Sequence, residues 1–102
     1  MISAKLLNPK SIVVVGGSDD ITKAGGKVLK NLLSGDFPGS LYVVNPKATV
    51  VQGLTAYADV SLVPRTDLAV IAVAARYCPG IVRTLATEKG TGGFIILSAG
   101  FS

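Results

Sequence analysis

The stretch VVVGGSDDITKAGGKVL, residues 13–29, contains the residue types best suited to holding an anion. An apolar run stops at one glycine pair, polar residues follow, and a second glycine pair opens a helix-like pattern. The N–H groups and the dipole at a helix N-terminus favour a bound phosphate. Lys23 and Lys27 lie beside this loop, and Lys47 follows a later apolar run. The pattern predicts a phosphate-binding loop.

The spacing of the glycines departs from two common nucleotide motifs. Gly16-Gly17-Ser18-Asp19 breaks the G-x-G-x-x-G fingerprint, and the sequence contains no G-K-[ST] of a P-loop. The second apolar run ends in Asn45-Pro46-Lys47, where an NAD enzyme places an acidic residue. A cation at that position attracts a phosphate on the ribose. The residues therefore favour a ligand with a pyrophosphate and a separate ribose phosphate, a pattern that both NADP and coenzyme A carry.

The absence of His and the presence of only one Cys exclude several kinds of catalysis and metal binding. The sequence has no His, which removes Ser-His-Asp catalysis, His-ligated metals and phosphohistidine chemistry from this chain. The single Cys, Cys78, rules out an intrachain disulfide, makes a structural zinc site implausible and fits a reducing cytosol, so we predict a cytoplasmic location. Asp19 and Asp20 are interpreted as loop polarity, because no second acid or base stands at a useful place. We predict no catalytic residue and no metal in this chain.

Composition indicates one well-packed domain over residues 1–102. Hydrophobic residues make up 49% of the sequence, and the net charge is a modest +4. There is neither a Lys/Arg-rich run nor a set of stacking aromatics, which argues against nucleic acid as a partner. The longest apolar run, residues 68–75, is far shorter than the roughly 20 residues that cross a bilayer, so no membrane segment and no signal peptide are predicted.

Strands and helices alternate along the sequence. β-branched apolar runs and amphipathic stretches between Gly and Pro residues predict each element. The predicted strands are Ser11–Val15, Leu41–Asn45, a short edge strand at Leu54–Tyr57, Leu68–Val73 and Phe94–Leu97; the predicted helices are Ala24–Ser34 and Tyr77–Glu88, with a helical turn at Asp59–Val63.

Each helix has one apolar face that we expect to point inward. The predicted inward residues are Val28, Leu29, Leu32 and Leu33 in the first helix and Ile81, Val82, Leu85 and Ala86 in the second.

This alternation predicts an α/β fold: a Rossmann-like, doubly wound parallel sheet in three layers, forming a single domain. Right-handed crossovers give the strand order 3-2-1-4-5, with the ligand outside the carboxyl ends of the strands where the order reverses. Because the sequence stops on a buried strand, we expect a domain of a longer multidomain chain.

Four segments together resemble the N-terminal CoA-binding domain of NDP-forming acyl-CoA synthetases, relatives of the succinyl-CoA ligase alpha subunit. They are LLNPKSIVVVGGSDD, GGKVLKNLLSGDFPGSLYVVNPK, GLTAYADVSLVPRTDLAVIAV and FIILSAGF, and their order and spacing cover nearly the whole chain. In that family the glycine loop, the NPK lysine and the SAGF strand end border the CoA nucleotide. Carried over, the resemblance implies a CoA site made by Gly17, Ser18, Lys23, Gly25, Gly26, Lys47, Ser98 and Ala99, with Ala74, Ala75 and Arg76 as the opposite wall.

The resemblance also implies a reaction that this chain does not complete alone. The family converts an acyl-CoA, a nucleoside diphosphate and phosphate to the acid, CoA and the triphosphate through a phosphohistidine on another domain. The chain would then hold CoA or acyl-CoA while further synthetase domains or subunits act as its partners. Two alternatives stay open: an acyl-CoA-sensing regulatory domain of a protein acetyltransferase, and an NADP-binding oxidoreductase domain.

Overall fold

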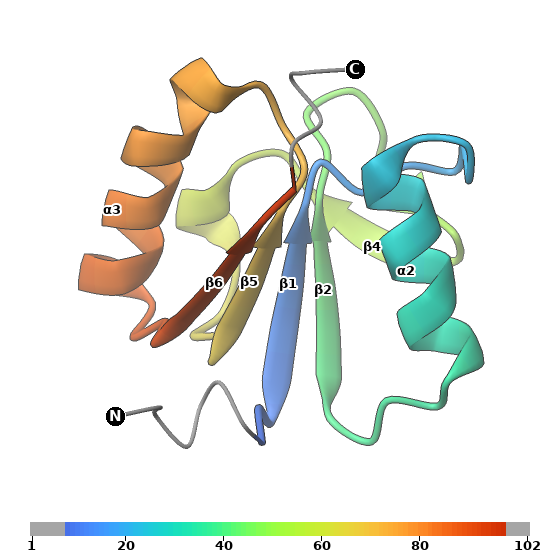
Figure 1. Cartoon of the computed structure of the whole chain (residues 1–102), viewed down its shortest axis with the longest axis horizontal. Coiled ribbons are helices and arrows are strands. Elements are labelled where there is room, and N and C mark those ends of the chain that lie inside the picture. The colour runs from blue at the N-terminus through green and yellow to red at the C-terminus, as the bar shows by residue number, and fades with distance from the viewer. Residues whose placement is uncertain (1–7, 98–102) are drawn as a thin grey trace.

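The computed structural model describes residues 8–97, which form a sheet of six strands between two helices (Figure 1). The strands are β1 (Ser11–Val15), β2 (Ser40–Val44), β3 (Val50–Val51), β4 (Leu54–Tyr57), β5 (Leu68–Ile71) and β6 (Gly93–Ile96). The helices are α2 (Ala24–Ser34) and α3 (Cys78–Glu88), with short 3₁₀ helices η1 (Val60–Leu62) and η2 (Ala75–Tyr77).

The sheet has the order β3-β4-β2-β1-β5-β6, and all its pairings are parallel except that of β3 with β4. The predicted order 3-2-1-4-5 is confirmed for the five predicted strands. The unpredicted β3 pairs antiparallel with β4, so β3 and not β4 forms that edge of the sheet. Figure 1 shows α2 and α3 on opposite faces, both beginning at the carboxyl ends of the strands. The predicted Rossmann-like fold class is therefore confirmed.

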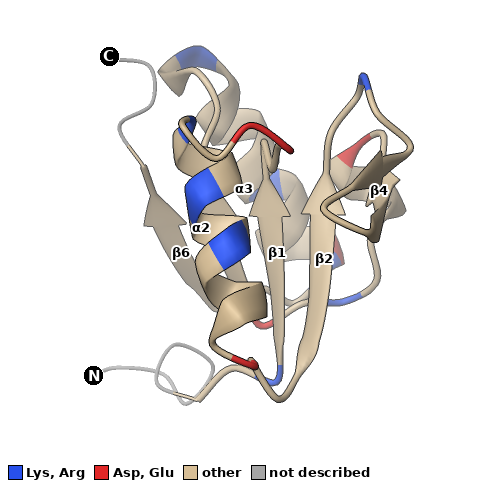
Figure 2. Ribbon diagram, turned by 90° about the vertical axis from the view of Figure 1, so that its right-hand side faces the viewer, with Lys and Arg blue, Asp and Glu red and all other residues tan. Residues whose placement is uncertain are grey.

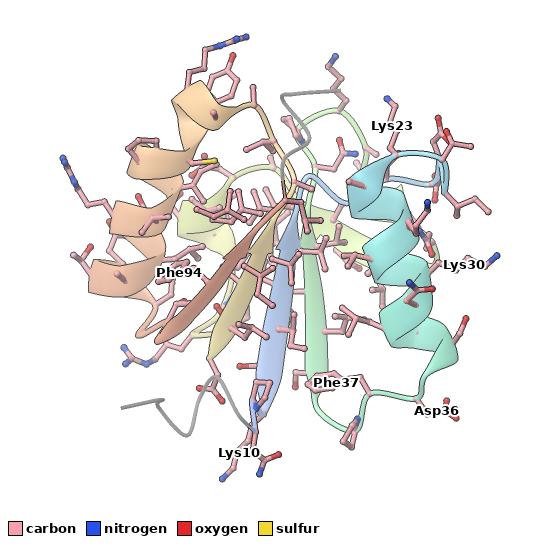
Figure 3. All side chains as sticks on the ribbon, in the orientation of Figure 1. Lys10, Lys23, Lys30, Asp36, Phe37 and Phe94 are labelled. Carbon is pink, nitrogen blue, oxygen red and sulfur yellow. The ribbon has the colours of Figure 1, made fainter. Side chains whose placement is uncertain are left out.

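The core lies on both faces of β1. Val13 and Val15 pack with Ile71 and Leu85 on the α3 face, and Val14 packs with Leu29 on the α2 face. Figure 3 shows Phe94 between α3 and the sheet. Alternating side chains of one buried strand thus support both helices, as a parallel sheet covered on each side requires.

Two predicted inward positions are wrong. Leu33 is 37% exposed, and Ala86 is exposed as well. The buried stripe of α2 instead runs through Gly25, Gly26 and Leu29, because the helix start packs against the preceding loop.

Several element ends also differ from the prediction. β2 runs from Ser40 to Val44, β5 stops at Ile71, and β6 covers Gly93–Ile96. The helical turn shrinks to η1, and α3 begins after η2. In residues 8–97 no helix is long and apolar enough to cross a membrane.

Candidate functional site

The turn that ends β1 lies at the centre of the carboxyl edge of the sheet. Gly16 has φ 89°, and its N–H donates to the Val44 carbonyl at 2.9 Å. A Cβ on Gly16 would lie 2.5 Å from the Ala72 oxygen and 2.9 Å from Val73 Cγ1. Only glycine fits this position, for both its backbone angle and its surroundings. Gly16 therefore marks the point between β2 and β5 where the strand order reverses.

The second glycine pair lets α2 begin directly on the loop backbone. A Cβ on Gly25 would overlap the Gly16 carbonyl, and one on Gly26 would overlap the Asp20 carbonyl. Both glycines are buried. Close helix-to-loop packing is thus one physical reason for this pair, independent of any ligand.

Short polar side chains close the loop on itself. The Ser18 hydroxyl accepts from the Asp20 N–H at 3.0 Å, and the Asp20 carboxylate accepts from the Thr22 N–H at 3.0 Å and the Thr22 hydroxyl at 2.6 Å. The two bonds from Thr22, that of its hydroxyl first, lower the pKa of Asp20 because they stabilise the charged carboxylate. A carboxylate so occupied is a poor general base, in agreement with the interpretation of Asp20 as loop polarity.

Asn45 joins the glycine loop to the end of β2. Its Nδ2 donates to the Gly17 carbonyl at 3.0 Å, and its Oδ1 accepts from the Lys47 N–H at 2.8 Å. The asparagine that replaces the acidic residue of NAD enzymes is therefore a structural link between the two loops. Sequence reasoning assigned this residue no role, because its partner Gly17 is 28 residues away.

A second unpredicted link comes from the turn between β3 and β4. The Gln52 side chain donates to the Ser18 and Gly26 carbonyls, and the Gln52 N–H donates to the Asp19 carboxylate. No local sequence signal reveals these contacts, since they join residues 26 to 34 positions apart.

A hollow of about 790 Å³, here called the α2 hollow, opens beside the start of α2. Lys23 precedes the helix with no side-chain cap, and the first turn has no acidic residue. Figure 3 shows Lys23 at the carboxyl edge of the sheet, and Figure 2 shows lysine positions along α2. The hollow thus joins helix-start N–H groups to ammonium groups, a combination suited to an anion. Its lining is Gly16, Thr22, Lys23, Ala24, Gly25, Lys27, Val28, Asn31, Ala72 and Leu97.

A hollow of about 730 Å³, here called the α3 hollow, opens between the ends of β1 and β2 and helix α3. Its apolar lining comes from Val15, Val44, Val60, Val73 and Ile81, and the rest from Gly16, Pro46, Lys47, Ala58, Asp59, Ala74, Tyr77, Gly80 and Thr84. A mainly apolar hollow with a few polar groups in its lining is typical of a site for a small-molecule ligand.

Charged groups stand around the α3 hollow. The Arg76 guanidinium stacks over the Tyr77 ring, 4.8 Å from its centroid, and its Nη2 donates to the Tyr77 hydroxyl at 3.3 Å. Asp59 accepts from the Ser61 hydroxyl and N–H, and these bonds lower the pKa of Asp59. Lys47 and Asp59 therefore give the lining one charge of each sign, and Arg76 adds a second cation through its contact with Tyr77.

The structure distributes the predicted site residues around Gly16. Lys23 and Gly25 line the α2 hollow, while Lys47 and Ala74 line the α3 hollow. Of the other predicted residues, Gly17 and Gly26 are buried and Ser18 is half-buried. Ala75 and Arg76 are exposed in η2. Ser98 and Ala99 lie outside the described residues.

Together the topology and the two hollows that share Gly16 define a Rossmann-like α/β domain with open space at the switch point of its sheet. Residues 10–102 match the family model described as CoA binding domain, and the chain belongs to this family.

Two relatives of this chain are much longer proteins. It is 41% identical over 99 residues to a trans-feruloyl-CoA synthase from an unknown prokaryotic organism, covering 96% of this chain and 14% of that protein. It is 38% identical over 98 residues to an ADP-forming acetate–CoA ligase from Archaeoglobus fulgidus, covering 95% of this chain and again 14% of the relative.

A solved structure gives the same relationship. The apo form of dinucleotide forming acetyl-coenzyme A synthetase 1 from Ca. Korarchaeum cryptofilum superimposes with a TM-score of 0.80 and 40% identity, over 88% of this chain and 20% of that chain. The predicted relationship is confirmed: the chain is homologous to the CoA-binding domain of NDP-forming acyl-CoA synthetases and spans a small part of them.

Proposed function

We propose that this chain binds coenzyme A across the two hollows that meet at Gly16. The observation that carries the proposal is their pairing: a mainly apolar hollow lined by Lys47 shares Gly16 with a hollow at the helix start that Lys23 and Lys27 line. In coenzyme A a single ribose carries the purine, the 3′-phosphate and, through its 5′ oxygen, the pyrophosphate. The family to which the chain belongs supports this ligand.

Each part of the ligand has a matching surface in this arrangement. The adenine occupies the α3 hollow against Val73, Ala74 and Tyr77, and the ribose 3′-phosphate faces Lys47. The pyrophosphate lies on the glycine loop near Lys23, since cations and helix-start N–H groups stabilise its charges. The pantetheine arm leaves toward the end of β6, where Leu97 lines the α2 hollow.

Calorimetry with coenzyme A and dephospho-CoA tests the assignment of Lys47. Dephospho-CoA lacks the ribose 3′-phosphate and is expected to bind more weakly. Lys47→Met is expected to weaken coenzyme A binding about 10- to 150-fold, as the loss of a charged hydrogen bond of about 1.5–3 kcal/mol predicts. The Lys47→Met variant is expected to bind dephospho-CoA about as tightly as the parent chain does, because that ligand lacks the phosphate that Lys47 faces.

Lys30→Met is the matched control, because Lys30 is exposed and points away from the molecule (Figure 3). We expect it to leave both affinities unchanged. Equal affinity of the parent chain for the two ligands would remove Lys47 from the site. Tight binding of NADPH with no binding of coenzyme A would assign the NADP alternative instead.

We further propose that the domain serves an NDP-forming acyl-CoA synthetase. The relatives named as CoA ligases and synthases support this role. Because the chain has no His, a phosphohistidine step requires a partner domain or subunit. The complete protein is expected to form ATP or GTP from acyl-CoA, the diphosphate and phosphate. Binding of acyl-CoA without any turnover would favour the sensor alternative.

A further inference from the structure

The hairpin at the edge of the sheet has an unusual turn residue. β3 and β4 pair through Val50–Thr55 and Val51–Leu54, with Gln52 and Gly53 between them. Both turn residues have left-handed backbones, with φ 47° at Gln52 and φ 85° at Gly53. Such two-residue turns favour Asn or Gly at the first position, and glutamine there is disfavoured. The turn alone gives no reason for a glutamine.

The side chain of Gln52 supplies that reason. Its Nε2 donates to the Ser18 carbonyl at 2.8 Å and to the Gly26 carbonyl at 2.9 Å. One amide carries two N–H donors, so both are used. These acceptors stand near the two ends of the glycine loop, and a single half-buried side chain bridges them. An asparagine amide is one methylene shorter and would not span the same gap.

The bridge also controls which groups of the loop can face an anion. A carbonyl oxygen repels phosphate, whereas an N–H attracts it. The Ser18 carbonyl and the Asp19 N–H share one planar trans peptide unit and point in opposite directions. Tying the carbonyl to Gln52 therefore directs that N–H away from the hairpin. The Asp19 carboxylate is also held on the hairpin, where it accepts from the Gln52 N–H at 2.6 Å.

We infer that Gln52 is a positioning residue for the ligand: the β3–β4 turn holds the glycine loop in the shape that receives the pyrophosphate of coenzyme A. This inference rests on the proposed function. Gln52 acts through the loop, since it lines neither the α2 hollow nor the α3 hollow. Figure 2 shows β4 beside β2, on the side of β2 away from β1.

Two substitutions distinguish the effect of the Gln52 side-chain hydrogen bonds from the effect of the backbone preference at residue 52. Gln52→Asn keeps a residue that favours the left-handed backbone but shortens the amide, and Gln52→Glu keeps the length but replaces the donors with oxygen. For Gln52→Asn we expect an unfolding midpoint close to that of the parent chain, because the turn preference of asparagine offsets part of the loss of the two hydrogen bonds, with about tenfold weaker binding of coenzyme A. For Gln52→Glu we expect a loss of at least that size, because a carboxylate would face two carbonyl oxygens.

The pattern across ligands distinguishes this role from that of Lys47. Both substitutions are expected to weaken coenzyme A and dephospho-CoA by the same factor, because both ligands carry the pyrophosphate. Thr55→Ala, an exposed change in the same hairpin, is the control and is expected to bind like the parent chain. Parent-like affinity in both Gln52 variants would overturn the inference.

If the parent chain does not bind coenzyme A, the proposed function is refuted, but the role of Gln52 in shaping the loop is still open to test. Amide hydrogen exchange tests that role without a ligand. The amides of Asp20, Thr22 and Lys23 are bonded within the loop. In Gln52→Glu we expect them to exchange at least about tenfold faster, with unchanged exchange of the Val14 and Leu29 amides. Unchanged loop exchange would show that Gln52 does not position the loop.

Discussion

At the residue scale, the short polar side chains of the glycine loop bond mainly to the loop itself. Asp20 accepts two hydrogen bonds from Thr22, and Ser18 accepts one from the Asp20 N–H. These bonds order a segment that has many glycines nearby and no core of its own. In the proposed function, Lys23 and Lys27 beside the loop supply the positive charges that face the anion.

We predict that Thr22→Val raises the pKa of Asp20 toward the ordinary carboxyl range. The Thr22 hydroxyl is the first cause of the lowered pKa, and the backbone N–H of residue 22 remains as a smaller one. An NMR titration of side-chain carboxyl carbons measures the change. Asp59, whose lowered pKa depends on Ser61, is the internal control and should not move. An unchanged Asp20 would contradict the assignment of its shift to Thr22.

The sign of the pH dependence follows from this shift. A lowered pKa in the folded loop means that the unfolded chain binds the proton more tightly. Ionised Asp20 therefore adds its full contribution to the free energy of unfolding when the pH is above the ordinary carboxyl pKa. That contribution is lost as the pH falls through the lowered pKa of Asp20, below about pH 4. Thr22→Val is expected to flatten this part of the acid unfolding curve.

At the element scale, the start of α2 depends on the absence of side chains. Gly25 meets the Gly16 carbonyl, and Gly26 meets the Asp20 carbonyl. Glycine costs a helix about 1 kcal/mol relative to alanine, so two consecutive glycines here oppose helix formation. Tertiary packing offsets that cost, because Leu29 one turn later is fully buried against the sheet.

We predict that Gly25→Ala destabilises the protein by about 1–3 kcal/mol, despite the better helix propensity of alanine. Denaturant unfolding measures this difference. The matched control is Gly80→Ala in α3, where a new Cβ meets no atom within 4 Å. We expect that control to be neutral or to stabilise by up to about 1 kcal/mol. A stabilised Gly25→Ala would refute the close approach between helix and loop.

At the scale of the whole molecule, the sheet is stable only when both faces are covered. Leu29 of α2 and Leu85 of α3 are each fully buried, on opposite faces and in separate clusters. The same arrangement places both helix starts at the carboxyl edge, beside the Gly16 turn (Figure 1). The docking of the two helices on opposite faces of the sheet therefore determines both the packing of the core and the geometry at the carboxyl edge.

We predict that Leu29→Ala and Leu85→Ala each lower the free energy of unfolding by about 2–5 kcal/mol. Leu33→Ala in α2 is the control, since Leu33 is 37% exposed, and its cost is expected to be below about 1 kcal/mol. Chemical denaturation monitored by circular dichroism provides these values. If Leu33→Ala lowered the free energy of unfolding as much as Leu29→Ala, Leu33 would point inward, as the helical pattern predicted.

The sequence predicted most of the architecture because its signals are local. β1, β4 and α2 have the predicted bounds, since β-branched runs and a helical apolar stripe are read within a few residues. β3 was missed because a strand of two residues has no periodicity to detect. Leu33 and Ala86 were misassigned because an apolar stripe does not say how wide the interface is.

For the site, the sequence by itself determined which groups are present: a glycine loop, a lysine after the second strand and no histidine. Only the tertiary structure decided how they are held. Asn45 and Gln52 bond to a loop 26 to 34 residues away, and the hollows form where β1, β2, β5 and the helices meet. The physical reason is that hydrogen bonds and packing act through space, whereas sequence patterns report only the preferences of neighbouring residues.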